Sequence, residues 1–232
     1  MIGKKKIELY LDGPTLQEIK TFKNVDGYTF NPSLCKKLEA ENYIEFTKKL
    51  INETNNKPIS IEVIADDDEN CTRQGKVLSK LGGNLYVKIP IIFTSGQSSK
   101  KTIKNLANQK IKLNITAIFE MSQVKGILPI LRDSNAILSI FSGRIFDIGL
   151  DAAKIFSEMA KCIHENSNCK VLWASCRMSY DYILAQKCNA DIITMSPNLA
   201  KKMTLFEKSP LEYSKDTVKG FFDDAKSSGF GF

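Results

Sequence analysis

The chain has 232 residues, of which 43% are hydrophobic and 25% are charged, so it can bury a full core. This composition excludes a disordered chain, and no run approaches the about 18 apolar residues of a membrane span, so we expect no membrane partner. The net charge of +7 and the isoelectric point near 9.0 favour anionic partners. The lysines are scattered and do not alternate with aromatic residues along one surface, so we expect no nucleic-acid partner.

Short apolar runs alternate with amphipathic segments along the chain. Eight runs have the composition of β-strands: Ile7–Leu11, Gly27–Thr29, Ile59–Ile64, Leu85–Ile89, Lys112–Ile118, Ala136–Ile140, Lys170–Ala174 and Asp191–Met195. Eight segments have helical periodicity: Thr15–Phe22, Tyr43–Thr54, Glu69–Leu81, Lys100–Gln109, Met121–Leu131, Ala152–Asn166, Met178–Lys187 and Pro197–Phe206. This alternation predicts parallel strands with helical crossovers, and eight units in about 210 residues favour a closed (β/α)8 TIM barrel, an α/β fold, over an open sheet. No dinucleotide-binding glycine motif or P-loop sequence occurs, which disfavours nucleotide-binding folds.

One more amphipathic segment, Thr217–Lys226, follows the eighth unit and carries Val218, Phe221 and Phe222 on or near one face. A Gly-Phe-rich end, Ser227–Phe232, comes after it. We expect an extra C-terminal helix over about residues 217–227, which docks either on the same barrel or on a neighbour. Without linkers or internal repeats, residues 1–232 are predicted to form a single domain.

The six cysteines are Cys35, Cys71, Cys162, Cys169, Cys176 and Cys188. None of them form a C-x-x-C pair, and His164 is the only histidine, so we expect neither a metal nor a cofactor. Scattered, reduced cysteines are typical of a cytoplasmic protein. Glu8 and Asp12 interrupt any apolar core of a signal peptide.

Lys88 lies in the run Leu85–Pro90, which otherwise has the composition of a buried strand. Burial of an ammonium among apolar neighbours is unfavourable, and a lowered pKa is the usual relief. A neutral amine is what attack on a ketone carbonyl requires. The alternative is a lysine at the end of a strand whose ammonium reaches solvent.

Polar side chains recur where the predicted strands end, which is where barrels of this kind carry their chemistry. They include Asp12, Thr29, Asn31, Glu62, Lys88, Asn114, Thr116, Ser139, Arg144, Ser175, Arg177 and Thr194. Each has a structural alternative. Asp12 could cap the helix that begins near Thr15, and Asn31 could start a helix at Pro32. Glu62 could face outward and the two arginines could be surface residues, or the arginines could form a bidentate phosphate clamp.

Seven short sequences carry a resemblance to a known family: Leu11-Asp12, Thr29-Phe30-Asn31-Pro32-Ser33, Glu62-Val63-Ile64-Ala65, Val87-Lys88-Ile89-Pro90, Asn114-Ile115-Thr116, Gly143-Arg144-Ile145-Phe146-Asp147-Ile148-Gly149 and Ala174-Ser175-Cys176-Arg177. In this order and spacing, they resemble the small transaldolase family, which includes the fructose-6-phosphate aldolases. The resemblance runs from about Ile7 to Lys226. It implies a class I enzyme that works through a Schiff base on sugar phosphates.

The resemblance also implies a role for each matching residue. Lys88 is the Schiff-base lysine, and Asp12 is the carboxylate that takes the proton of the C4 hydroxyl. Glu62 and Thr116 hold a catalytic water. The substrate site comprises Thr29, Asn31, Asn114, Phe141, Arg144, Ser175 and Arg177, with Arg144, Ser175 and Arg177 at the sugar phosphate.

Two positions separate the two activities within the family. By the resemblance, the fructose-6-phosphate aldolases carry Gln at the position of Glu62 and Tyr at the position of Phe141, whereas this chain has Glu and Phe there, as the transaldolases do. We therefore favour a transaldolase of the pentose phosphate pathway, with an aldolase that releases dihydroxyacetone as the alternative. Gly13 and Phe30 depart from the family pattern, and Phe30 lies next to Asn31, where it could reshape the donor pocket. A barrel that binds sugar phosphate without turnover is therefore a further alternative. The resemblance also implies a homo-oligomer, such as a pentameric or decameric ring.

Overall fold

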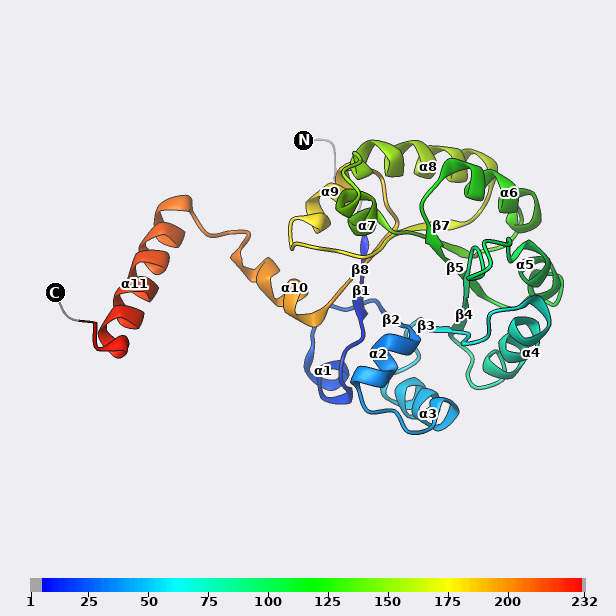
Figure 1. The fold of residues 1–232 in the computed structure, drawn as a ribbon, viewed down its shortest axis with the longest axis horizontal. Helices are drawn as coiled ribbons and strands as arrows, with labels where there is room; N and C mark the ends of the chain where they lie inside the picture. The colour runs from blue at the N-terminus through cyan, green and yellow to red at the C-terminus, as the bar shows by residue number, and fades with distance from the viewer. Residues whose placement is uncertain (1–5, 231–232) are drawn as a thin grey trace. The chain divides into compact units, whose positions relative to one another are not determined.

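A computed structural model describes residues 6–230, which form two compact units that divide after Ala200. The first unit is a closed barrel of eight parallel strands in sequence order, in which β8 also pairs with β1 (Figure 1). The strands are β1 (Glu8–Asp12), β2 (Gly27–Phe30), β3 (Ile59–Glu62), β4 (Leu85–Pro90), β5 (Leu113–Ile118), β6 (Ile137–Ile140), β7 (Lys170–Trp173) and β8 (Ile192–Met195). All eight predicted strands and the predicted (β/α)8 barrel are confirmed.

The helices around the barrel follow the predicted segments closely. They are α1 (Leu16–Thr21), α3 (Tyr43–Glu53), α4 (Asp68–Leu78), α5 (Lys100–Ala107), α6 (Met121–Leu131), α8 (Ala152–Asn166), α9 (Asp181–Lys187) and α10 (Pro197–Lys202). Two short helices were not predicted as segments: α2 (Pro32–Lys37) directly follows β2, and α7 (Ser142–Asp147) directly follows β6. Figure 1 shows α2 and α7 closer to the barrel axis than α3 and α8. These two helices therefore flank the end of the barrel where the strands finish.

The barrel interior changes from apolar to polar along the strands. Because side chains alternate across a strand, every second residue faces inward. The buried cluster in the apolar layer consists of Tyr10, Ile137, Leu172, Ala174 and Ile192, with Tyr86 and Phe141 packed against it. Two residues beyond Tyr10 and Tyr86 come Asp12 and Lys88, which begin the polar layer. The filled interior supports a polar site at the carboxyl ends of the strands.

The second unit contains the short 3₁₀ helix η1 (Met203–Leu205) and the helix α11 (Pro210–Ser228). The predicted C-terminal helix therefore exists, but it begins at Pro210 rather than near residue 217. A capping box between Ser209 and Glu212 starts it, and Gly229 ends it with a positive φ of 69°. Its phenylalanines Phe221 and Phe222 are 69% and 57% exposed. The organisation of residues 1–232 as one domain stays a prediction, and residues 231–232 of the Gly-Phe-rich end lie outside the described residues.

Candidate active site

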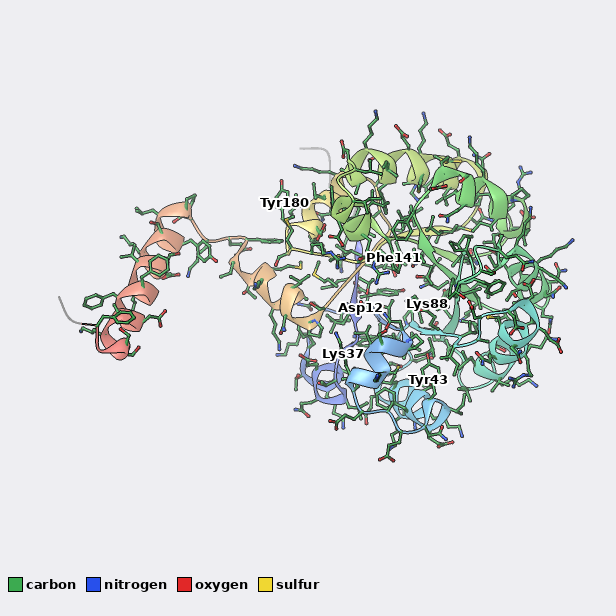
Figure 2. All side chains as sticks on the ribbon, in the orientation of Figure 1. Asp12, Lys37, Tyr43, Lys88, Phe141 and Tyr180 are labelled. Atoms are coloured by element: carbon green, nitrogen blue, oxygen red, sulfur yellow. The ribbon has the colours of Figure 1, made fainter. Side chains whose placement is uncertain are left out.

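A cavity of about 290 Å³ opens at the carboxyl ends of the strands. Nine of the eleven predicted site residues line it: Asp12, Thr29, Asn31, Lys88, Thr116, Phe141, Arg144, Ser175 and Arg177. In Figure 2, the labelled side chains of Asp12, Lys88 and Phe141 lie at the middle of the barrel. The two remaining predicted residues, Glu62 and Asn114, do not line the cavity. Glu62 forms an ion pair with the lining residue Lys88, and Asn114 accepts a hydrogen bond from the lining residue Ser139.

Lys88 is the buried cation of the cavity. Its side chain is only 7% exposed, and its Nζ lies 3.0 Å from Glu62 Oε2. The pair arises from strand register, because Glu62 on β3 lies directly beside Lys88 on β4 and both face inward. The alternatives of a solvent-exposed lysine and of an outward-facing Glu62 are therefore wrong. A buried amine beside a carboxylate has a proton acceptor within hydrogen-bond distance.

Asp12 is the second carboxylate of the cavity and is held by a chain of two threonines. Its Oδ1 accepts a hydrogen bond of 2.7 Å from Thr29 Oγ1. Since Thr29 has a single hydroxyl hydrogen, Thr194 must donate the 2.7 Å hydrogen bond between the two threonines. Burial raises the pKa of Asp12 above its usual value, although Lys88 and Thr29 act to lower it. The capping alternative is wrong for Asp12, because Thr15 caps α1.

Asn114 lies beneath the cavity in a buried hydrogen-bond network. Its Nδ2 donates to Ser60 Oγ at 3.0 Å, and Ser139 Oγ donates to its Oδ1 at 2.7 Å. Only Ser139 of these three residues lines the cavity. The network therefore fixes the orientation of one cavity residue from strands β3, β5 and β6.

Thr116 brings an unpaired hydroxyl to the cavity. The residue is 1% exposed, and its Oγ1 has no hydrogen-bond partner among the described residues. The next residue, Ala117, has a positive φ of 57°, and the pairing of β5 with β6 shifts there between Ile115 and Ile118. Such bulges re-aim side chains next to active sites. The Thr116 hydroxyl is therefore available to bind a water or a substrate hydroxyl.

Two arginines line the cavity near the ends of β6 and β7. Arg144 lies over the ring of Phe141, with 5.4 Å from its Cζ to the ring centroid. Arg177 is already paired, because its Nε donates to Asp147 Oδ1 and Oδ2 at 3.0 and 3.1 Å and its Nη2 also contacts Asp147. This ion pair raises the pKa of Arg177 and lowers the pKa of Asp147. An anion that binds Arg177 must therefore compete with or join Asp147.

A close backbone contact holds α7 against the end of β7. A Cβ on Gly143 would lie 1.6 Å from the carbonyl oxygen of Ser175, so only glycine fits this position. Ser175 itself has a positive φ of 64°. The contact joins the helix that carries Arg144 to the loop that carries Ser175 and Arg177, so these three predicted phosphate-binding residues come together as a group.

The cavity also has lining residues that the resemblance gave no role: Ser33, Leu34, Lys37, Ser139, Ala174, Cys176, Thr194, Met195 and Ser196. Ser139 and Thr194 were visible as polar residues at strand ends, whereas Lys37 depends on the unpredicted helix α2.

The side chain of Phe30 does not reach the cavity, and Gly13 lies behind Leu34, one of the lining residues. Phe30 is fully buried, because strand alternation turns it away from the side of Thr29. Gly13 has a positive φ of 64° in the turn after β1, where a Cβ would meet the side chain of Leu34 at 2.6 Å. Neither residue lines the cavity.

All six cysteines are free. Across residues 6–230, no His, Cys, Asp and Glu side chains form a group of three or more suited to a metal ion. Over the same residues, no helix combines the length and apolar character that crossing a membrane requires.

Comparisons with known proteins show the family to which the chain belongs. The profile of the family "Transaldolase/Fructose-6-phosphate aldolase" matches residues 9–230, so the chain belongs to this family. A probable transaldolase of Bartonella henselae is 28% identical over 96% of this chain and 98% of its own length. A probable transaldolase of Methanococcus maripaludis is 31% identical over 85% of this chain and 89% of its own length.

Two solved structures share the fold alone. One is a cube-shaped, highly porous protein cage designed by fusing symmetric oligomeric domains, with a TM-score of 0.57 and 13% identity over 96% of this chain and 78% of that chain. The other is the carboxyl transferase domain of Rhizobium etli pyruvate carboxylase, with a TM-score of 0.60 and 7% identity over 85% of this chain and 41% of that chain.

Proposed function

We propose that this family member is a transaldolase of the pentose phosphate pathway. It transfers a dihydroxyacetone unit from a ketose phosphate, fructose 6-phosphate or sedoheptulose 7-phosphate, to an aldose phosphate through a Schiff base on Lys88. The observation that carries this proposal is the buried Lys88 amine, 3.0 Å from Glu62 at the centre of the cavity.

The first half of the reaction forms the Schiff base. Lys88 passes a proton to Glu62, and its neutral amine adds to the C2 carbonyl carbon of the ketose. Glu62 and the unpaired Thr116 hydroxyl hold the water that carries protons to and from the carbinolamine oxygen. That oxygen leaves as water, which gives the iminium.

The second half breaks and remakes a carbon–carbon bond. The C3–C4 bond breaks, its electron pair moves into the iminium to give an enamine, and the C4 hydroxyl proton passes to Asp12. Because burial raises the pKa of Asp12, this carboxyl can hold the proton until the acceptor arrives. The enamine then attacks the acceptor aldehyde, Asp12 returns the proton, and hydrolysis frees Lys88.

The substrate phosphate is assigned to the group formed by Arg144, Ser175 and Arg177. Arg144 forms no hydrogen bond or salt bridge with any described residue, so its guanidinium can meet a phosphate directly. Arg177 would exchange or share its Asp147 partner with the phosphate. Thr29 and Asn31 are assigned to the substrate hydroxyls near Lys88.

Transfer is favoured over release by Glu62 and Phe141. Position 62 carries a carboxyl group paired with Lys88 rather than an amide, and Phe141 offers no phenol to position a water that would protonate the enamine. The alternative of a barrel without turnover relied on Phe30 and Gly13, and neither residue is part of the cavity lining.

An acceptor-dependence assay tests this proposal. The protein is incubated with fructose 6-phosphate, with or without erythrose 4-phosphate, and products are separated by chromatography. We expect sedoheptulose 7-phosphate and glyceraldehyde 3-phosphate only with the acceptor, and little free dihydroxyacetone without it. Equal release of dihydroxyacetone in both reactions would identify an aldolase. The double variant with Glu62→Gln and Phe141→Tyr should shift the balance toward release, whereas Phe30→Tyr should not.

We also propose a cytoplasmic homo-oligomer, a ring such as a pentamer or decamer. The exposed apolar residues of α11, Leu211, Val218, Phe221 and Phe222, support an interface between copies. Light scattering after size exclusion should report a multiple of the 26.0 kDa chain, and a monomer at all concentrations would refute the ring.

A further inference from the structure

A tyrosine outside the cavity holds the backbone of Glu62. The Tyr43 hydroxyl donates a hydrogen bond of 2.6 Å to the backbone oxygen of Glu62. Tyr43 does not line the cavity, and the family resemblance gives it no role. In Figure 2, Tyr43 lies on the outer side of Lys88, toward α3. The pair of Lys88 and Glu62 is therefore supported from a surrounding helix as well as from the strands.

The sequence around Tyr43 fixes this tyrosine in the first turn of α3. Asn42 caps the helix, because its side chain accepts from the backbone N–H groups of Ile44 and Glu45, both at 3.0 Å. The buried Thr47 donates to the Tyr43 carbonyl at 2.7 Å. Burial raises the pKa of Tyr43, so its hydroxyl keeps its proton and remains a donor.

Glu62 is the last residue of β3, where the pairing with β2 runs out. Tyr28 on β2 donates to the Pro58 carbonyl at 2.9 Å, and donors along a parallel strand recur at every second residue. In this register, the Glu62 carbonyl would pair with residue 32. That residue is Pro32, which begins α2 and has no backbone N–H. The Tyr43 hydroxyl supplies the donor that Pro32 lacks.

The peptide group that follows Glu62 is thereby held at both of its polar atoms. Its oxygen accepts from Tyr43, and its N–H, which belongs to Val63, donates to the Lys88 carbonyl at 3.0 Å. This peptide lies at the point where the chain leaves the sheet, so without the tyrosine only one bond opposes its rotation. Because the Glu62 side chain starts from this peptide, rotation would move its carboxylate away from the Lys88 amine, 3.0 Å distant.

We propose that Tyr43 is a positioning residue for Glu62: its hydroxyl holds the end of β3, so that the Glu62 carboxylate stays within hydrogen-bond distance of Lys88. This inference rests on the proposed function, in which Glu62 takes a proton from Lys88. Tyr43 lies outside the cavity lining and acts through the backbone alone. A phenylalanine there would keep the ring and lose the bond to Glu62.

A double-mutant cycle tests the proposal. The rate at which saturating fructose 6-phosphate forms a borohydride-reducible adduct on Lys88 is measured by rapid quench and peptide mass spectrometry. The four proteins are the wild type, Tyr43→Phe, Glu62→Ala and the double variant. We expect Tyr43→Phe to slow adduct formation about two- to tenfold, in line with the loss of one hydrogen bond, and to have no further effect once residue 62 is alanine. Tyr182→Phe is the matched control and should keep the wild-type rate, because Tyr182 is also half-buried, lies on α9 and does not line the cavity.

Crystal structures of the wild type and Tyr43→Phe add a readout that does not depend on turnover. The distance between Lys88 Nζ and Glu62 Oε2 should stay near 3.0 Å in the wild type and exceed about 3.5 Å in Tyr43→Phe. An unchanged distance, an unchanged rate, or an equal slowing with Glu62 and with alanine at position 62 would overturn the assignment. A wild type that forms no adduct would refute the proposed function, while the distance would still decide the role of Tyr43.

Discussion

Replacement of Gly143 by alanine should disrupt the arginine side of the cavity. The added Cβ would lie 1.6 Å from the Ser175 carbonyl oxygen, whereas real Cβ contacts stay beyond 3.0 Å, so the backbones must separate by about 1.4 Å. Because the obstacle is backbone rather than a flexible side chain, α7 or the loop after β7 must move. Overpacking of this kind costs about 1–3 kcal/mol and sometimes more. For a chain of this size, that corresponds to a melting temperature lower by about 2–12 °C.

The functional effect should be larger than the loss of stability, because Arg144 and Ser175 move apart. A misplacement near 1 Å can cost on the order of 100-fold in rate. Thermal unfolding and steady-state kinetics with fructose 6-phosphate measure the two effects. Gly126→Ala is the matched control: a Cβ there meets nothing within 4 Å in the middle of α6, so this change should stabilise by about 0.5–1 kcal/mol. A Gly143→Ala protein with the wild-type melting temperature and KM would refute the reasoning.

Three further variants test separate parts of the site. Asp12→Asn should abolish transfer and raise the melting temperature at neutral pH. Because folding raises the pKa of Asp12, the wild type loses stability as the pH rises above the usual aspartate pKa, and the asparagine variant does not. In thermal melts across a pH series, the difference in melting temperature between the two proteins should vanish at lower pH. Asn114→Ala leaves two buried serine hydroxyls without a partner, so urea unfolding should show a loss of about 2–5 kcal/mol, against less than about 0.5 kcal/mol for the exposed Asn135→Ala. Asp147→Asn weakens the ion pair with Arg177, so Arg177 is freer to bind the phosphate and the KM for the ketose phosphate should fall. A higher KM would show instead that Asp147 positions Arg177 for the phosphate.

The barrel and most of the cavity could be predicted because both follow from strand periodicity. Glu62 and Lys88 each occupy an inward position two residues after another inward residue, so register alone brings them together. The same alternation turns Phe30 away from the barrel interior, toward the surrounding helices, where it is fully buried. This orientation follows from the position of Phe30 next to the inward-facing Thr29 in the sequence.

The rest of the site required the structure. Helices α2 and α7 are each followed by a longer helix, α3 or α8, whose periodicity already accounts for the crossover between strands. Neither short helix was therefore predicted, although Asn31-Pro32 is a recognisable helix start. The ion pair between Asp147 and Arg177 joins residues 30 positions apart through the packing of α7 against the loop after β7, and no local pattern specifies it. Helix α11 begins earlier than predicted because the prediction relied on the amphipathic pattern of residues 217–226. The capping box of Ser209 and Glu212, with Pro210 at the first helical position, marks the true start.

The Schiff base on Lys88 is tested most directly by borohydride trapping with fructose 6-phosphate, read by intact and peptide mass spectrometry. Lys88→Met is the test variant, and Lys37→Gln controls for a cavity lysine that does not attack the carbonyl. We expect a reduced dihydroxyacetone or hexose-phosphate adduct on the peptide that contains Lys88, present in the wild type and in Lys37→Gln and absent from Lys88→Met. A wild type without any adduct from fructose 6-phosphate or sedoheptulose 7-phosphate, or an adduct that persists in Lys88→Met, would contradict the proposed mechanism.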